Sequence, residues 1–172
     1  MAEIYTIWNA PMPTTAAMAK VTTSATLATM LQLKLGSTLV YPRPKVIEWG
    51  VSFDGSAAAT PFQCELFACT GAATVTAHVA AGIVNSDPKA ATPTDGFPFA
   101  LGTALTGYTS SAEGTVAACR MFDSQNVAPT NQYVTQFPLG RETGQWTIAE
   151  FIRIRIWGDG VVKCLCYVKV EI

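Results

Sequence analysis

Residues 147–157 and 161–172 alternate between apolar and polar side chains with a period of two. Successive side chains of a β-strand point to opposite faces of a sheet, so each segment predicts a strand with one buried face. Gly158-Asp159-Gly160 lies between them, and an Asp-Gly pair favours the short turn of a hairpin. We therefore predict a terminal β-hairpin within an all-β domain. The second segment places six apolar residues on one face: Val162, Cys164, Cys166, Val168, Val170 and Ile172.

Shorter alternating segments predict the other strands, and turn residues such as Asp54-Gly55-Ser56 separate them. Residues 26–35 fit a helix or a strand, and the strand is favoured because no good C-terminal cap follows. About eight or nine strands with uneven connections indicate an antiparallel β-sandwich, of jelly-roll or other Greek-key type. The expected strands are residues 2–8, 26–35, 45–53, 62–70, 114–122 and 132–137 and the two terminal segments, with residues 123–130 as a turn. In residues 45–53 the expected core side chains are Ile47, Trp49, Val51 and Phe53.

The chain has 172 residues, which is most simply one domain. Residues 1–20 are expected to form an extended N-terminal arm or first strand that packs on an adjacent subunit, and residues 21–172 to form the sandwich. Residues 71–110 have the composition of a long loop insertion, with a short strand or a helical turn at 74–79. Such a loop often carries a binding surface. The alternatives are that it wraps a neighbouring subunit or covers a sheet edge.

Charged residues make up only 13% of the chain, compared with roughly 25% in ordinary globular domains. Low charge suits a protein that buries part of its surface against copies of itself, although a monomer with a Thr- and Ser-rich surface is the alternative. The net charge of −1 and the lack of a Lys/Arg run argue against a nucleic-acid partner. No signal peptide and no apolar stretch of about 18 residues is present, so no membrane partner is expected.

Cysteine and histidine are the residues that would bind a metal or act as a nucleophile with its base. All cysteines lie in strand-like segments and are expected to be reduced and buried, in a chain synthesised in a cytosol. Cys164 and Cys166 share a face, but their spacing is not that of a zinc site, and His78 lacks a neighbouring Ser-Gly elbow. We therefore expect no metal and no cofactor. The cysteines are Cys64, Cys69, Cys119, Cys164 and Cys166.

Paired carboxylates are the remaining candidates for catalysis. Glu65, Glu113, Glu142 and Glu150 lie in or beside different predicted strands, and two of them in one cleft would suit a hydrolase. Their spacing does not bring them together, and a glutamate on the solvated face of a strand is the ordinary case. We therefore predict no catalytic residue and a protein that is not an enzyme.

Arg153 and Arg155 share a predicted strand face with Phe151 and Trp157. One interpretation is a pair of cross-strand ion pairs with Glu48 or Glu65. The other is a subunit interface, where Arg and Trp are enriched. The candidate interface residues are Tyr5 and Trp8 in the arm, Arg141 after the turn at 138–140, and Arg153, Arg155 and Trp157.

Residues 46–56 (VIEWGVSFDGS) and 133–142 (YVTQFPLGRE) resemble small proteins encoded among the virion genes of tailed bacteriophages and prophages of actinobacteria. The resemblance extends over about residues 20–172. It implies a structural role on the capsid surface of a virion, since head decoration proteins of such viruses commonly have compact β folds and often form trimers. The implied partners are further copies of the chain, as a homotrimer, and the major capsid protein. Closed symmetry lets every copy use the same patch.

The alternative function is a carbohydrate- or receptor-binding β-sandwich on the virion or its tail. Phe97, Phe99 and Tyr108 lie in the predicted long loop, where their rings would stack on a sugar. The other interpretation is that these rings anchor the loop to the domain.

Overall fold

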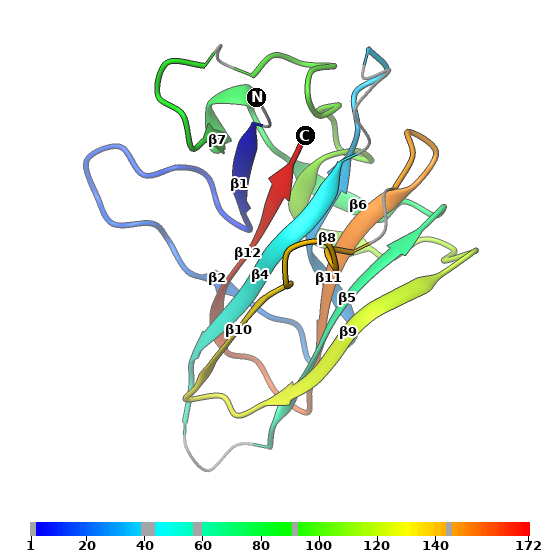
Figure 1. Cartoon of the computed structure of the whole chain (residues 1–172). Helices are drawn as coiled ribbons and strands as arrows, with labels where there is room; N and C mark the ends of the chain where they lie inside the picture. The colour runs from blue at the N-terminus through cyan, green and yellow to red at the C-terminus, as the bar shows by residue number, and fades with distance from the viewer. Residues whose placement is uncertain (1–2, 39–43, 57–59, 91–92, 144–145) are drawn as a thin grey trace.

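The computed structural model has two antiparallel β-sheets that face each other across one hydrophobic core (Figure 1). Its described part contains no α-helix and one short 3₁₀ helix, η1 (Ala80–Gly82). The predicted all-β, two-sheet sandwich is therefore confirmed. The structure describes residues 3–38, 44–56, 60–90, 93–143 and 146–172.

Sheet A is built around two long strands that run side by side along one wall of the sandwich. It contains β1 (Ile4–Trp8), β2 (Val21–Thr22), β4 (Lys45–Asp54), β7 (Ile83–Asn85), β10 (Gln132–Gln136) and β12 (Lys163–Glu171). The strand order is β10-β4-β12-β1-β7, and β2 pairs with the start of β12.

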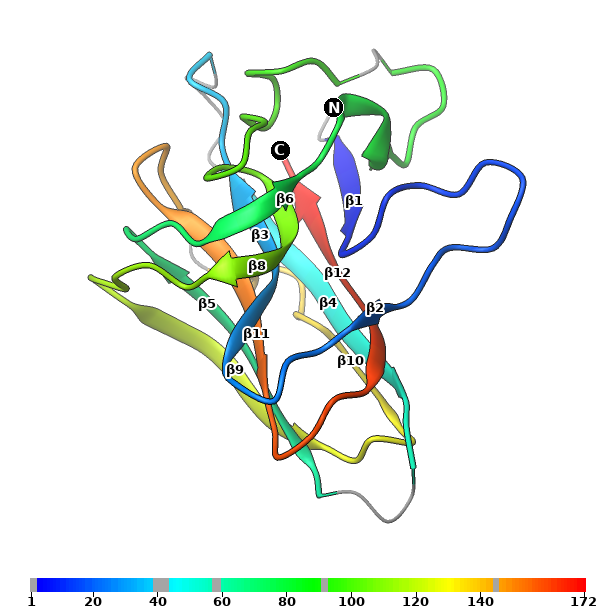
Figure 2. The same cartoon turned by 180° about the vertical axis from the view of Figure 1, so that it is seen from behind.

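Sheet B forms the opposite wall. Seen from behind, its strands β6 and β8 lie beside β3, at one end of the sheet (Figure 2). It contains β3 (Ala28–Lys34), β5 (Phe62–Cys69), β6 (Thr74–Ala77), β8 (Gly107–Ala112), β9 (Arg120–Val127) and β11 (Phe151–Trp157). The strand order is β6-β8-β3-β11-β5-β9.

The pairing of the strands is nested along the chain. β5 pairs with β9, β4 with β10, β3 with β11 and β1 with β12, all antiparallel. This is the pattern of one long antiparallel hairpin. The further pairs β12 with β4 and β11 with β5 show that the hairpin is rolled up, which divides it into two sheets.

The two terminal strands do not form the predicted hairpin. β11 lies in sheet B between β3 and β5, whereas β12 lies in sheet A between β4 and β1. Gly158-Asp159-Gly160 therefore begins a crossing between sheets, and the hairpin prediction is wrong. The prediction that each segment is a strand with a core-facing side is confirmed, because a strand in either sheet turns one face to the shared core. The residues that enter this core are Ile152, Ile154 and Ile156 of β11 and Cys164, Cys166, Val168 and Val170 of β12.

One core position in β4 was also predicted wrongly. Lys169 faces Glu48 and Val170 faces Val46, so Ile47 between them has no partner and forms a β-bulge. An extra residue reverses the alternation. Val46 therefore enters the core, fully buried, while Ile47 is half-buried.

The strand predicted at residues 114–122 lies instead at β9, and the predicted turn at 123–130 is largely strand. Asp123 and Ser124, which suggest a turn, face Leu66 and Glu65 of β5. The Asp123 carboxylate accepts hydrogen bonds from other strands, from the Trp49 indole at 3.1 Å and from the Tyr133 hydroxyl at 2.8 Å. Pairing with β5 therefore overrides the local preference for a turn.

Residues 71–110 contain more structure than a loop. β6 and the first residues of β8 extend sheet B beyond β3 (Figure 2), and β7 extends sheet A beyond β1 (Figure 1). This insertion between β5 and β9 therefore covers an edge of each sheet, as one of the alternative interpretations expected.

The N-terminal segment is part of the sandwich at β1, which lies between β12 and β7. Tyr5 and Ile7 are buried in the core. Buried Asn9 then accepts a hydrogen bond from the backbone nitrogen of Cys166 at 2.8 Å. The expected first strand is therefore present at residues 4–8, where it pairs within the chain and not with a neighbouring subunit, while residues 1–2 lie outside the described residues.

Candidate functional site

The outer face of sheet B is buried near its centre, although the outer face of a sandwich sheet is usually solvated. Phe67, Cys69 and Phe151 form a second hydrophobic cluster there, separate from the main core. Ala72 and Val116, from the two ends of the insertion, pack against this cluster. The insertion therefore folds back over the sheet from which it leaves.

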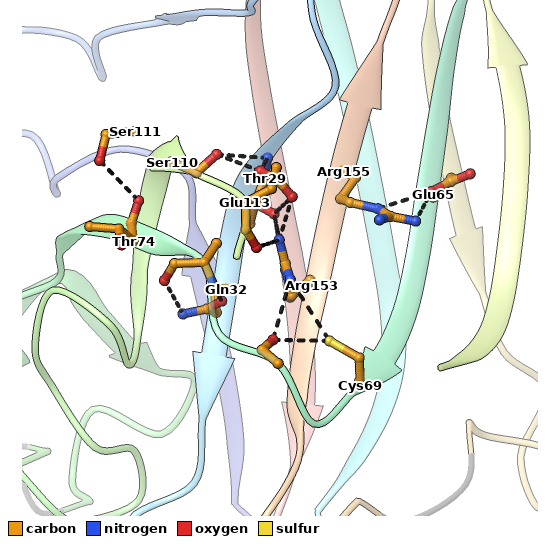
Figure 3. Close-up of polar contacts among 12 residues, drawn as sticks. Thr29, Gln32, Glu65, Cys69, Thr74, Ser110, Ser111, Glu113, Arg153 and Arg155 are labelled. Atoms are coloured by element: carbon orange, nitrogen blue, oxygen red, sulfur yellow. Dashed lines mark hydrogen bonds and ion pairs between the residues drawn. The ribbon is translucent and has the colours of Figure 1, made fainter. Parts of the chain in front are cut away.

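Arg153 of β11 lies under this cover and is fully buried. Figure 3 shows its guanidinium pointing toward Thr29 and Glu113. It donates to Thr29 Oγ1 at 3.0 Å, to the Gly71 carbonyl at 3.3 Å and to the Glu113 carbonyl at 3.2 Å, and it forms an ion pair with the Glu113 carboxylate. A buried guanidinium is tolerated only with such partners, because removing it from water is costly. We call Arg153, Thr29, Glu113, Gly71 and Ser110 the arginine cluster.

The Glu113 carboxylate connects the insertion, which includes β8, to β3. It accepts from the backbone nitrogen and the hydroxyl of Thr29 and from the Ser110 hydroxyl, the last at 2.6 Å. The register of β3 against β11 shifts beside Thr29, so Met30 has no partner residue on β11. β3, β8 and β11, together with both ends of the insertion, therefore meet at the Arg153–Glu113 ion pair.

Arg155 forms the cross-strand ion pair that was one of the two predicted interpretations. Its guanidinium lies 2.8 Å from the Glu65 carboxylate on β5 and stacks over the Phe67 ring at 4.1 Å. Glu48, the other predicted partner, instead binds Lys169 at 2.7 Å. The Arg153–Glu113 pair was not predicted, because Glu113 lies just beyond β8 and comes close only when the insertion folds back.

The predicted interface residues do not gather in one place. Tyr5 and Arg153 are buried inside the chain and present no surface to a neighbour. Trp8 is half-buried on sheet A, whereas Trp157 is 46% exposed on sheet B. Arg155 is half-buried in its ion pair with Glu65, and Arg141 is exposed in the connection before β11.

The three loop aromatics also differ in their surroundings. Phe99 is fully buried and packs edge-on against Tyr5, with ring centroids 6.1 Å apart. Tyr108 is half-buried against His78, and Phe97 is 44% exposed. Phe99 is therefore an anchor of the insertion and not part of a binding surface.

A second aromatic feature, which the sequence analysis did not identify, lies on the outer face of sheet A. Trp8 and Tyr167 contact each other with ring centroids 4.7 Å apart. The Tyr167 ring occupies the space above Gly50, where any Cβ would meet the ring at 2.7 Å. Its hydroxyl donates to Glu48 at 2.6 Å. The pKa of Tyr167 is raised, mainly because its hydroxyl is buried and secondly because it donates to the Glu48 carboxylate. We call Trp8, Tyr167 and Gly50 the aromatic platform.

The four candidate carboxylates have separate partners. Glu65 pairs with Arg155, Glu113 with Arg153, and Glu150 with Arg120, whereas Glu142 accepts from the backbone nitrogen of Gly140 at 2.9 Å. No two of them face each other in these contacts. Among the described residues, no group of three or more His, Cys, Asp or Glu side chains is placed to hold a metal ion.

Four of the five cysteines are buried as predicted, but Cys119 is exposed. The prediction was wrong for Cys119 because this residue lies before β9, in the loop that ends the insertion, next to Ala118 with a positive φ of 47°. Burial raises the pKa of the Cys64 and Cys164 thiols to about 12.

His78 is a buried structural residue. Its Nε2 lies 2.6 Å from the Trp8 carbonyl, and its ring packs against Tyr108 and Gly82. Because the carbonyl only accepts, the ring nitrogen is the donor. Burial lowers the pKa of His78, and the hydrogen bond to Trp8 opposes this shift.

We expect Glu113→Gln to lower the free energy of unfolding by about 3 kcal/mol, because it leaves the Arg153 charge buried without a counter-ion. Asp54→Asn is the matched control, since its ion pair with Lys20 is exposed and a surface ion pair contributes little to stability. Urea denaturation measures both. Equal, small losses would show that Arg153 does not depend on the Glu113 carboxylate.

We expect the stability of the folded chain to fall as the pH drops below about 6.5, the ordinary pKa of His. The pKa of His78 is lowered on folding, so the unfolded chain binds the proton more tightly and protonation favours unfolding. This contribution is fully present above pH 6.5 and is lost on acidification. Urea midpoints at pH 7.5 and 5.5 should differ more for the native chain than for His78→Gln. Identical differences would contradict the assignment, since His78 is the one histidine in the sequence.

Comparison with known proteins gives no relative for this chain. No family model, no curated protein and no solved structure matches it. The described residues include no helix with the length and hydropathy of a membrane span. What the protein does must therefore be inferred from its own geometry.

Proposed function

We propose that the chain is a non-enzymatic structural protein of a virion, which decorates or cements a phage capsid as a homotrimer. The observation that carries the proposal is the apolar surface that the fold leaves exposed in a chain with 13% charged residues. Exposed apolar side chains with little surrounding charge favour contact with another protein surface. The large ones are Leu27, Val79, Phe97, Met121, Val134, Leu139, Ile148, Trp157 and Val161.

Two of these side chains indicate where contacts would form. Leu139 is 95% exposed in the connection between β10 and β11. Trp157 is 46% exposed at the end of β11, and tryptophan is enriched at interface hot spots. A closed trimer would use the Trp157 face on each copy and leave other exposed apolar residues for the major capsid protein.

We further infer that the sandwich is a jelly roll. The nested pairs from β5–β9 outward to β1–β12, together with the rolled-up contacts β12–β4 and β11–β5, support this assignment. Jelly rolls occur in viral capsid proteins and in lectins. The fold therefore suits both a capsid role and a sugar-binding role, and the choice between them depends on the surfaces.

Carbohydrate binding, on the virion surface or its tail, is the second candidate function. The aromatic platform favours it, because Trp8 and Tyr167 lie together on an outer sheet face beside Glu48 and Lys169. An aromatic face with polar groups at its rim is suited to a sugar ring, which has apolar and hydroxyl-bearing surfaces.

We expect light scattering behind size exclusion to give a mass about three times the 18.3 kDa of the chain. Trp157→Glu should convert this species to a monomer, because it places a charge in the proposed interface. Val134→Glu is the matched control, since Val134 is similarly exposed but lies on sheet A. A native chain that stays monomeric at high concentration and does not co-sediment with capsids of tailed actinobacterial phages would refute the proposal.

For the second function, we expect a bound sugar to quench the fluorescence of Trp8. A glycan array would identify the sugar, and Trp8→Ala should abolish binding because it removes half of the platform. Trp157→Ala, on the opposite sheet, should bind normally. If the native chain binds no sugar on a broad glycan array, this function is excluded for the aromatic platform.

A further inference from the structure

Two cysteines flank the insertion between β5 and β9. Cys69 is the last residue of β5, and Cys119 directly precedes β9. Ala68 faces Arg120 in the antiparallel pair. One further step along the same register places Cys69 opposite Cys119. Residues opposite each other in such a pair project to the same face of the sheet.

The two cysteines lie near each other, and the Cys69 thiol contributes to raising the pKa of Cys119 after burial. The chain ends beside them are held together, because the Thr70 backbone nitrogen donates to the Ala117 carbonyl at 3.0 Å and the Thr70 hydroxyl donates to it at 3.1 Å. Opposite residues have Cβ atoms about 4.5–5.5 Å apart, and a disulfide needs about 3.5–4.5 Å. A small approach of the strand ends is therefore sufficient for a bond.

The pair has one accessible and one protected member. Cys119 is exposed and, with Thr70, Arg120 and Glu150, lines a hollow in the surface. Cys69 is buried behind it, where its sulfur lies 3.2 Å from the Gly71 carbonyl. A small disulfide reagent can therefore reach Cys119 first, and Cys69 is placed to attack the product.

We propose that Cys69 and Cys119 form an intrachain disulfide by exchange with a small-molecule disulfide such as oxidised glutathione. The Cys119 thiolate attacks one sulfur of the reagent, which forms a mixed disulfide and releases one glutathione thiolate. The Cys69 thiolate then attacks the Cys119 sulfur and releases the second. The two cysteine thiols lose two protons and two electrons in total, and one oxidised glutathione becomes two reduced molecules.

This bond would join the two ends of the insertion. It would close the chain from residue 69 to residue 119 into a covalent loop and restrict the unfolded state. It would also hold Gly71 and Glu113, which lie just inside those ends, close to Arg153. The inference does not depend on the proposed function, because it rests on the register and contacts of two residues.

The test uses the full chain, incubated with oxidised glutathione at about pH 8.5, because burial and the neighbouring Cys69 raise the pKa of Cys119. Alkylation after unfolding, followed by peptide mapping, should give a linked Cys69–Cys119 peptide. Cys64, Cys164 and Cys166 are internal controls and should be fully alkylated, since they are buried in the main core. The Tm of the oxidised chain should be higher by about 10 °C, and reduction of the disulfide should restore the original Tm.

Cys119→Ser is the matched variant, because it changes an exposed residue and leaves Cys69 packed with Phe67 and Phe151. Its Tm should not respond to the oxidant. The proposal is overturned if native Cys119 keeps a glutathione adduct, or joins a second chain, while Cys69 remains alkylatable. A linked peptide without a rise in Tm would overturn the inference that the bond stabilises the fold.

Discussion

The ion pair between Arg153 and Glu113 is the contact on which the arrangement of sheet B depends. A charged side chain that is fully buried must be compensated by nearby charge and hydrogen bonds, and here those partners come from β3 and from both ends of the insertion. The insertion is therefore attached to the domain by one specific polar contact as well as by apolar packing around Phe67. This arrangement explains how the described part of the insertion, which is rich in Gly and small side chains, keeps a defined position.

The remainder of the fold follows from the rolled hairpin. Its nested pairs determine which strands meet, and the insertion at its tip supplies β6, β7 and β8 to an edge of each sheet. β6 and β7 then form these edges, and such short edge strands offer few unpaired backbone groups to another chain. The surfaces left for a partner are then the outer faces, with Trp157 on sheet B and the aromatic platform on sheet A.

The candidate sites were only partly visible in the sequence. Arg155 and Glu65 lie on neighbouring strands, so alternation was enough to suggest their ion pair. Tyr5 and Phe99 were candidates for surface contacts but are buried, because the first segment is an internal strand and Phe99 anchors its loop, which were the alternative interpretations. The aromatic platform joins residues near opposite ends of the chain, and the local pattern of a sequence segment does not predict such a contact.

The sequence by itself determined the all-β class, most strand positions and the buried face of β12, because alternation with a period of two is a local property of each strand. Only the tertiary structure decided which strands are neighbours. The apparent terminal hairpin divides between two sheets, since a strand with one buried face fits either wall of a sandwich equally well. Bulges at Ile47 and Met30, the burial of Arg153 and the pairing of Cys69 with Cys119 likewise depend on contacts between distant segments. A single strand does not encode such contacts, because its own pattern specifies only which side faces inward.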